Sequence, residues 1–145
     1  MVANRDRIEL FLDLKDRLSS DGDPSSISSP MLFAYSTLAG NFCADLIYYE
    51  SRSASPSTRR IHPMIDFSKS PTTISDAAWR DSIQRYAGIF WKRAATTGPG
   101  GEEQILVDMI NESIKGLSRP SSTDTPNLLL MVCTAMGSSL EAISY

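Results

Sequence analysis

The chain has 145 residues, of which 41% are hydrophobic and 21% are charged. A chain of this length and composition can bury one self-supporting core, which excludes a disordered or fibrous protein. The formal net charge is −3, no apolar run approaches the ~18 residues of a membrane span, and charges from Arg5 to Glu9 interrupt any signal-peptide-like stretch. We therefore expect one domain over residues 1–145, without a membrane span and located in the cytoplasm.

The chain opens with two predicted amphipathic helices. The first covers residues 4–18, where apolar side chains recur at helical spacing: Ile8, Phe11, Leu12, Leu14 and Leu18. The second should begin at Ser29-Pro30, a capping residue followed by proline at the first helical position. Its apolar stripe consists of Tyr35, Leu38, Phe42, Leu46 and Tyr49. Gly40 in this stripe indicates a close approach by another backbone or side chain, since glycine is costly inside a helix.

Residues 51–73 are rich in Ser, Pro and Arg and predict a long connection, for which a functional loop and an ordered crossover are both open readings. A third helix follows from Thr73 or Ser75 to Ala94, before a turn at residues 97–101. A fourth begins at Glu102 and closes near Lys115 and Gly116. The last, residues 127–143, is apolar on nearly every side and should therefore be central.

These elements contain helical periodicity and no alternating strand pattern. The predicted fold class is therefore all-α, a globular bundle of about five to seven helices around the last one.

The pattern of reactive side chains argues against an enzyme. The only histidine, His62, is expected in a solvated loop, so no nucleophile has an adjacent base. The carboxylates are expected on exposed helix faces. Cys43 and Cys133 lie among apolar neighbours without metal-ligand spacing, and two buried, reduced thiols are the expectation. We therefore expect no catalytic site, no metal site and no cofactor, and a function in binding or assembly.

Two segments resemble the Bcl-2 family of apoptosis regulators. Residues 4–15 (NRDRIELFLDLK) are similar to its BH4 helix, and residues 38–42 (LAGNF) to its BH3 region, with a serine-rich loop between them as in the family. The Asn-Trp-Gly-Arg signature of the family's central helix is missing, residues 86–93 (YAGIFWKR) are a loose substitute, and the membrane anchor is absent. This pattern resembles the divergent Bcl-2 proteins of large DNA viruses, which act in the host cell cytoplasm.

The resemblance implies a groove that holds an amphipathic, BH3-like helix of a protein partner, with an arginine facing the aspartate of that helix. The residues expected to line it come from the second and third helices: Leu38, Phe42, Leu46, Ile83, Arg85, Phe90 and Arg93.

Charge suggests an alternative, a viral coat or nucleoprotein subunit that self-assembles and binds RNA. Residues 50–95 hold eight basic and four acidic residues, whereas the segments on either side are acidic. Phosphate contacts would come from this basic middle: Arg52, Arg59, Arg60, Lys69, Arg80 and Lys92. The acidic pI of about 5.1 weighs against this alternative. Self-association is left open under both hypotheses.

Overall fold

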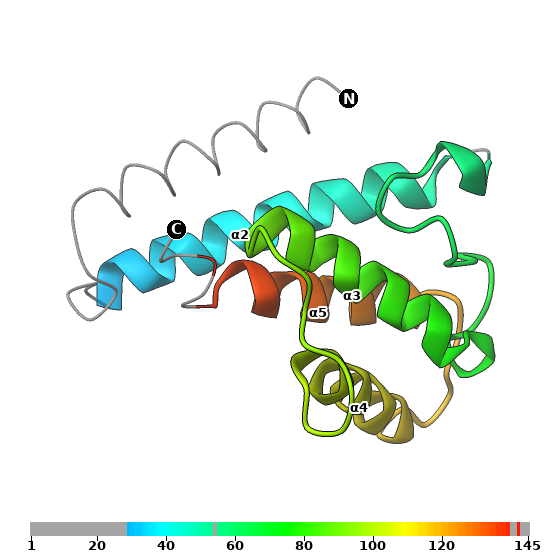
Figure 1. Cartoon of the computed structure of the whole chain (residues 1–145). Helices are drawn as coiled ribbons and strands as arrows, with labels where there is room; N and C mark the ends of the chain where they lie inside the picture. Colours follow the sequence, from blue (N-terminus) through cyan, green and yellow to red (C-terminus); the bar gives the residue numbers. More distant parts are fainter. Residues whose placement is uncertain (1–28, 54, 140–141, 143–145) are drawn as a thin grey trace.

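The computed structural model describes residues 29–53, 55–139 and 142 (Figure 1). This part of the chain contains four α-helices and two short 3₁₀ helices, and none of its residues is in a β-strand. The all-α class is therefore confirmed, but the described residues hold fewer α-helices than the five to seven expected. The helix predicted at residues 4–18 lies outside the described residues.

Local capping signals set most of the helix ends. Helix α2 (Ser29–Ser51) begins at the predicted Ser-Pro pair. Helix α3 (Asp76–Phe90) is capped by Ser75, whose side chain accepts a hydrogen bond from the backbone N–H of Ala78. Helix α4 (Glu102–Lys115) has two glutamates in its first turn and ends at Gly116, as predicted.

The end of the third helix and both ends of the last helix differ from the predicted boundaries, and the last helix ends at Gly137 instead of Ile143. Helix α3 ends at Phe90, four residues before Ala94, because Lys92 adopts a left-handed backbone conformation with φ of 58° that a helix cannot continue through. Helix α5 (Asp124–Gly137) begins before Pro126, which sits in its first turn, where a missing N–H costs nothing. Gly98 and Gly100 have positive φ and form the predicted turn between α3 and α4.

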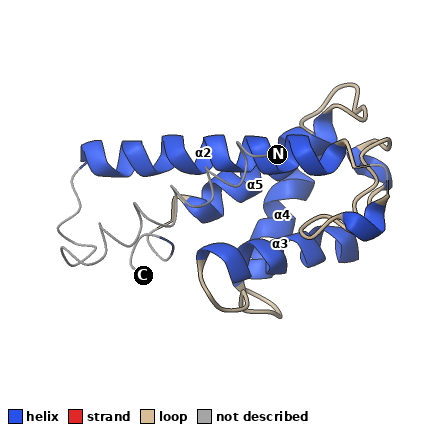
Figure 2. Cartoon of the chain, turned by 90° about the horizontal axis from the view of Figure 1, so that it is seen from above, coloured by secondary structure: helices blue, strands red, loops and turns tan. Residues whose placement is uncertain are grey.

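The last helix is central, as its apolar sequence predicted. Helix α5 packs against each of the other three α-helices, and α2 lies along one edge of the bundle (Figure 2). The closest approach occurs at Gly137 of α5, where a Cβ atom would lie 3.0 Å from the Phe90 ring and 3.1 Å from Ala39. At Gly40 a Cβ atom would make only an ordinary contact with Thr134. The close approach inferred at Gly40 is therefore found at Gly137 instead.

A disulfide joins Cys43 of α2 to Cys133 of α5, with Cα atoms 5.8 Å apart. Both residues are fully buried. The expectation of two reduced thiols was wrong, because packing α2 on α5 brings together two cysteines that are 90 residues apart in sequence.

The long connection is an ordered crossover that contains the 3₁₀ helices η2 (Pro56–Thr58) and η3 (Pro71–Thr73). It is tied to α3 by the Arg85 guanidinium, which donates to the carbonyl of Arg60 at 2.7 Å. It is tied to α5 by the Thr125 hydroxyl, which donates to the carbonyl of Lys69 at 2.9 Å. Its attachment to α2 is through Glu50.

Candidate functional site

Glu50, His62 and Tyr86 form a buried polar network between α2, the connection and α3. The Glu50 carboxylate accepts backbone N–H groups of Arg60, Ile61 and His62, the last at 2.8 Å. The His62 ring bonds Glu50 through Nδ1 at 2.9 Å and the Tyr86 hydroxyl through Nε2. Because a carboxylate only accepts hydrogen bonds, the His62 Nδ1 carries a proton and donates a hydrogen bond to Glu50.

This network corrects two expectations about reactive groups. His62 is fully buried rather than solvated, and Glu50 is 3% exposed rather than on an outer helix face. Burial and the nearby Glu50 charge raise the pKa of Tyr86 well above its usual value, which keeps its hydroxyl protonated. All three side chains are closed off from solvent and bonded to one another, so the network fixes the connection in place and presents no group to a substrate.

The ionisation of Glu50 makes stability depend on pH. Burial raises the pKa of Glu50, but the hydrogen bond and charge of His62 and the backbone N–H donors outweigh it, so the pKa lies below its usual value of 4.5. A lowered native pKa contributes stability that is present above about pH 4.5 and is lost as the pH falls through the native value.

We expect Glu50→Gln to unfold more easily than the parent near neutral pH and to lose less further stability on acidification. Urea midpoints measured at several pH values between about 3 and 7 test this, with the difference between the two proteins isolating Glu50 from the other carboxylates. Parallel curves for parent and variant would contradict it.

The structure places the residues predicted to hold a partner helix mostly in the core. Phe42, Leu46, Ile83 and Phe90 are each no more than 6% exposed, so in this conformation a ligand cannot reach them. Leu38 packs against the core and is partly buried. Their stripes face the bundle interior because α2 and α3 bury these sides against α5.

The two arginines of the groove hypothesis are engaged within the chain. Arg85 pairs with Asp81 at 2.9 Å, and Arg93 pairs with Glu102 through two hydrogen bonds of 2.8 and 2.9 Å. The Arg93 guanidinium lowers the pKa of Glu102 to about 2.

The basic residues of the RNA hypothesis fall into two groups. Arg59 donates to the carbonyl of Ile65 at 2.6 Å, and Arg80 pairs with Glu103 at 2.9 Å, so both stabilise the fold. The other four are exposed: Arg52, Arg60, Lys69 and Lys92. Arg60 lies beside the end of α2, where its backbone N–H donates to Glu50, and Arg52 follows Glu50 by two residues.

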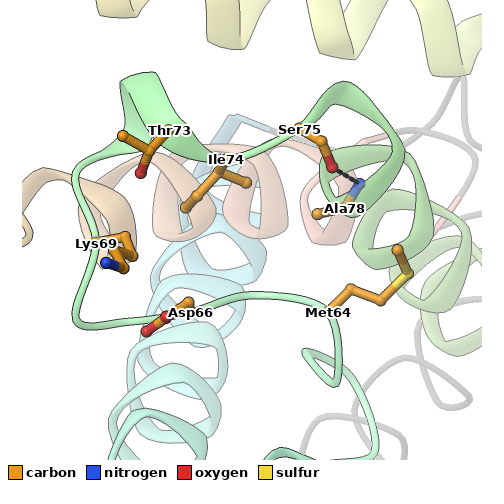
Figure 3. Close-up of a pocket in the computed structure, with 7 residues that line it drawn as sticks. All are labelled: Met64, Asp66, Lys69, Thr73, Ile74, Ser75 and Ala78. Carbon is orange, nitrogen blue, oxygen red and sulfur yellow. Dashed lines mark hydrogen bonds between the residues drawn. The ribbon is translucent and has the colours of Figure 1, made fainter.

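A shallow pocket of about 360 Å³ lies between the connection and the start of α3 (Figure 3). Its polar lining includes Asp66 and Lys69, and Met64 and Ile74 supply apolar contacts. Asp66 is bonded locally, to the N–H and hydroxyl of Ser68. Opposite charges and a small volume do not define a ligand class, so this pocket carries no functional assignment.

The outward face of α2 is the most distinctive surface of the described residues. Five of its exposed residues fall within an arc of about 80°, at the ~100° per residue of an α-helix: Phe33, Thr37, Asn41, Ala44 and Tyr48. Phe33 is 75% and Tyr48 59% exposed, and the flanking Tyr49 is 44% exposed. The exposed residues between Phe33 and Tyr49 are all uncharged. Arg52, one turn beyond, places its guanidinium 4.3 Å from the centre of the Tyr48 ring.

Helix α4 shows how a solvated helix face differs from this one. Its exposed residues include Asp108, Glu112 and Lys115, and its one large exposed apolar residue is Ile105. A helix that faces water usually carries charges on that side. The outward face of α2 instead has the composition of an interface core, with aromatic residues and no charge. The apolar stripe of α2 predicted only its core side and gave no indication of this exposed, uncharged face.

None of the helices in the described ranges combines the length and the hydropathy that a bilayer crossing requires. Those ranges also contain no cluster of three or more His, Cys, Asp or Glu side chains arranged to hold a metal ion. Compared with the models of protein families, with curated proteins and with solved structures, this chain gave no match.

Proposed function

We propose that this protein is a non-enzymatic interaction module that binds an amphipathic helix of a protein partner along the outward face of α2. The observation that carries the proposal is the uncharged, aromatic composition of that exposed face. Tyrosine and arginine are the residue types that most often dominate binding energy at interfaces, and Tyr48 and Arg52 lie together at one end of it.

Rigid support of the face adds to its suitability for binding. The disulfide fixes α2 to α5 at Cys43, on the opposite side of the helix. The Glu50 network fixes the end of α2 to the connection. A preorganised surface loses little conformational entropy on binding, so a helical ligand would need fewer contacts for the same affinity.

In this proposal, the Bcl-2-like hypothesis specifies the ligand, which would be a BH3-like helix. A BH3 peptide is an amphipathic helix with apolar residues at i, i+3 or i+4 and i+7, which is the pattern that a long helix face can hold. Binding in a groove between α2 and α3 would require the core around Phe42 and Phe90 to open, because both are buried. Docking on the outward face of α2 requires no such opening.

A protein partner is favoured over RNA by the local charge balance. Arg80, Arg85 and Arg93 each pair with a carboxylate of this chain, which cancels much of the positive charge of the middle segment. Neutralisation of phosphates needs several cations gathered on one surface. The uncharged face of α2 offers none between Phe33 and Tyr49.

The disulfide leads us to place the protein in an oxidising environment, such as a secretory compartment, the cell exterior or a virion surface. Partners would then be expected in the same environment.

Truncation of Tyr48 should weaken binding of a helical ligand. Titration of the full chain with a panel of amphipathic peptides, BH3 peptides among them, should give dissociation constants on the order of micromolar. Tyr48→Ala should weaken the tightest of them roughly 10- to 30-fold, because an aromatic anchor at an interface contributes about 2 kcal/mol. Ile105→Ala, an exposed apolar residue on α4, is the matched control and should bind like the parent.

The salt dependence of binding distinguishes this proposal from the RNA alternative. Apolar helix docking responds weakly to ionic strength, whereas RNA binding falls steeply with it. If the chain binds RNA, Arg60→Ala should reduce the salt slope by roughly one unit, while Tyr48→Ala would not. Tight, salt-sensitive RNA binding with no response to any peptide would overturn the proposed function.

A further inference from the structure

We infer that the partner seated on the outward face of α2 is a second copy of this chain, packed antiparallel against the same face. This inference rests on the proposed function, because it uses the same surface and names its occupant. Such a pairing is isologous: each copy contributes the same residues around a two-fold axis.

The first argument is electrostatic. A surface that meets its own copy must not place like charges opposite each other, since these are destabilising. The exposed residues from Phe33 to Tyr49 carry no charge, so two copies can approach over the whole length without repulsion. A charged face would avoid opposing like charges only in particular registers of the two helices.

The second argument is the symmetry of the face about its own midpoint. Phe33 and Tyr48 are 15 residues apart, about 22 Å along the helix, and the midpoint falls between Gly40 and Asn41. In an antiparallel pair Phe33 of one copy therefore meets Tyr48 of the other, and Thr37 meets Ala44. Large rings pack at both ends, and small side chains in the middle let the helix axes approach closely.

Asn41 occupies the position nearest the two-fold axis, and its amide suits that position. An amide carries donors and an acceptor together, so two copies of Asn41 can each donate to and accept from the other. A single polar residue of this kind at the centre of an apolar helix pair fixes its register and orientation.

The exposed area of this face determines the expected affinity of the dimer. Covering a whole aromatic side chain buries about 150–250 Å², and Phe33 and Tyr48 are 75% and 59% exposed. With the small residues between them, two copies would bury on the order of 1,000 Å², the lower end of specific interfaces. The dimer should accordingly have a dissociation constant on the order of 10 μM and exchange with monomer.

Cysteine cross-linking tests both the association and its direction. In the full chain, Asn41→Cys should form a covalent dimer under mild oxidation, because the two introduced thiols meet near the axis. Phe33→Cys is the matched control: it is more exposed, yet it faces Tyr48 of the second copy and should cross-link little. The native Cys43–Cys133 bond is buried and should persist in both variants.

A second measurement keeps the inference testable without cross-linking. Sedimentation of the parent should show a monomer–dimer equilibrium, and Ala44→Glu should abolish it with an unchanged circular dichroism spectrum, since Ala44 is exposed. Equal cross-linking at positions 33 and 41 would overturn the antiparallel pairing. The parent protein could instead stay monomeric to about 500 μM and still bind amphipathic peptides through Tyr48. That result would overturn the inference that the partner is a second copy, and the proposed function would still hold.

Discussion

Removing the disulfide with Cys43→Ala and Cys133→Ala is expected to lower the free energy of unfolding by about 4–5 kcal/mol. The bond closes a loop with a sequence separation of 90 residues, and a cross-link over such a distance restricts the unfolded chain strongly. The bond is also fully buried, so it should resist reductant until the bundle opens.

Urea unfolding of the oxidised parent, the reduced parent and the double variant measures this effect. The reduced parent should match the double variant, and reductant should leave the double variant unchanged. The slope against urea should also rise, because the unfolded chain without the cross-link exposes more surface. Equal stability of the oxidised and reduced parent would show that the two thiols are not bonded in solution.

Phe42→Ala is expected to destabilise the protein by about 3–5 kcal/mol, the cost of deleting a fully buried aromatic ring and leaving a cavity. Phe42 is 1% exposed, and its ring meets Phe90 edge to face with centroids 5.6 Å apart. Thermal and urea unfolding of the monomer, at concentrations below the expected dimer dissociation constant, give the difference.

Phe33→Ala is the matched control for this measurement, because it removes the same side chain from the same helix. Phe33 is 75% exposed, and its loss should change stability by less than about 0.5 kcal/mol. Similar losses from both variants would mean that Phe33 is covered in solution. An unchanged midpoint for Phe42→Ala would place that ring on a surface, as the groove hypothesis requires.

The sequence by itself determined the helical class, the starts of α2, α3 and α4, and the central place of α5. These features depend on signals that act within a few residues: a cap such as Ser75, a glycine after a helix, or an apolar segment too long to leave exposed. Such short-range signals act in the same way in any tertiary arrangement, which explains why the sequence could predict these features.

Only the tertiary structure decided which side chains meet. Cys43 bonds to Cys133, and His62 is enclosed by Glu50 and Tyr86, although nothing near either residue in sequence indicates its partner. The candidate site depends on the same information. The apolar stripe of α2 predicted the core side with Phe42, but it gave no indication that the other side would expose the aromatic rings of Phe33 and Tyr48. Packing against α5 covers the side with Phe42 and leaves the uncharged outward face exposed.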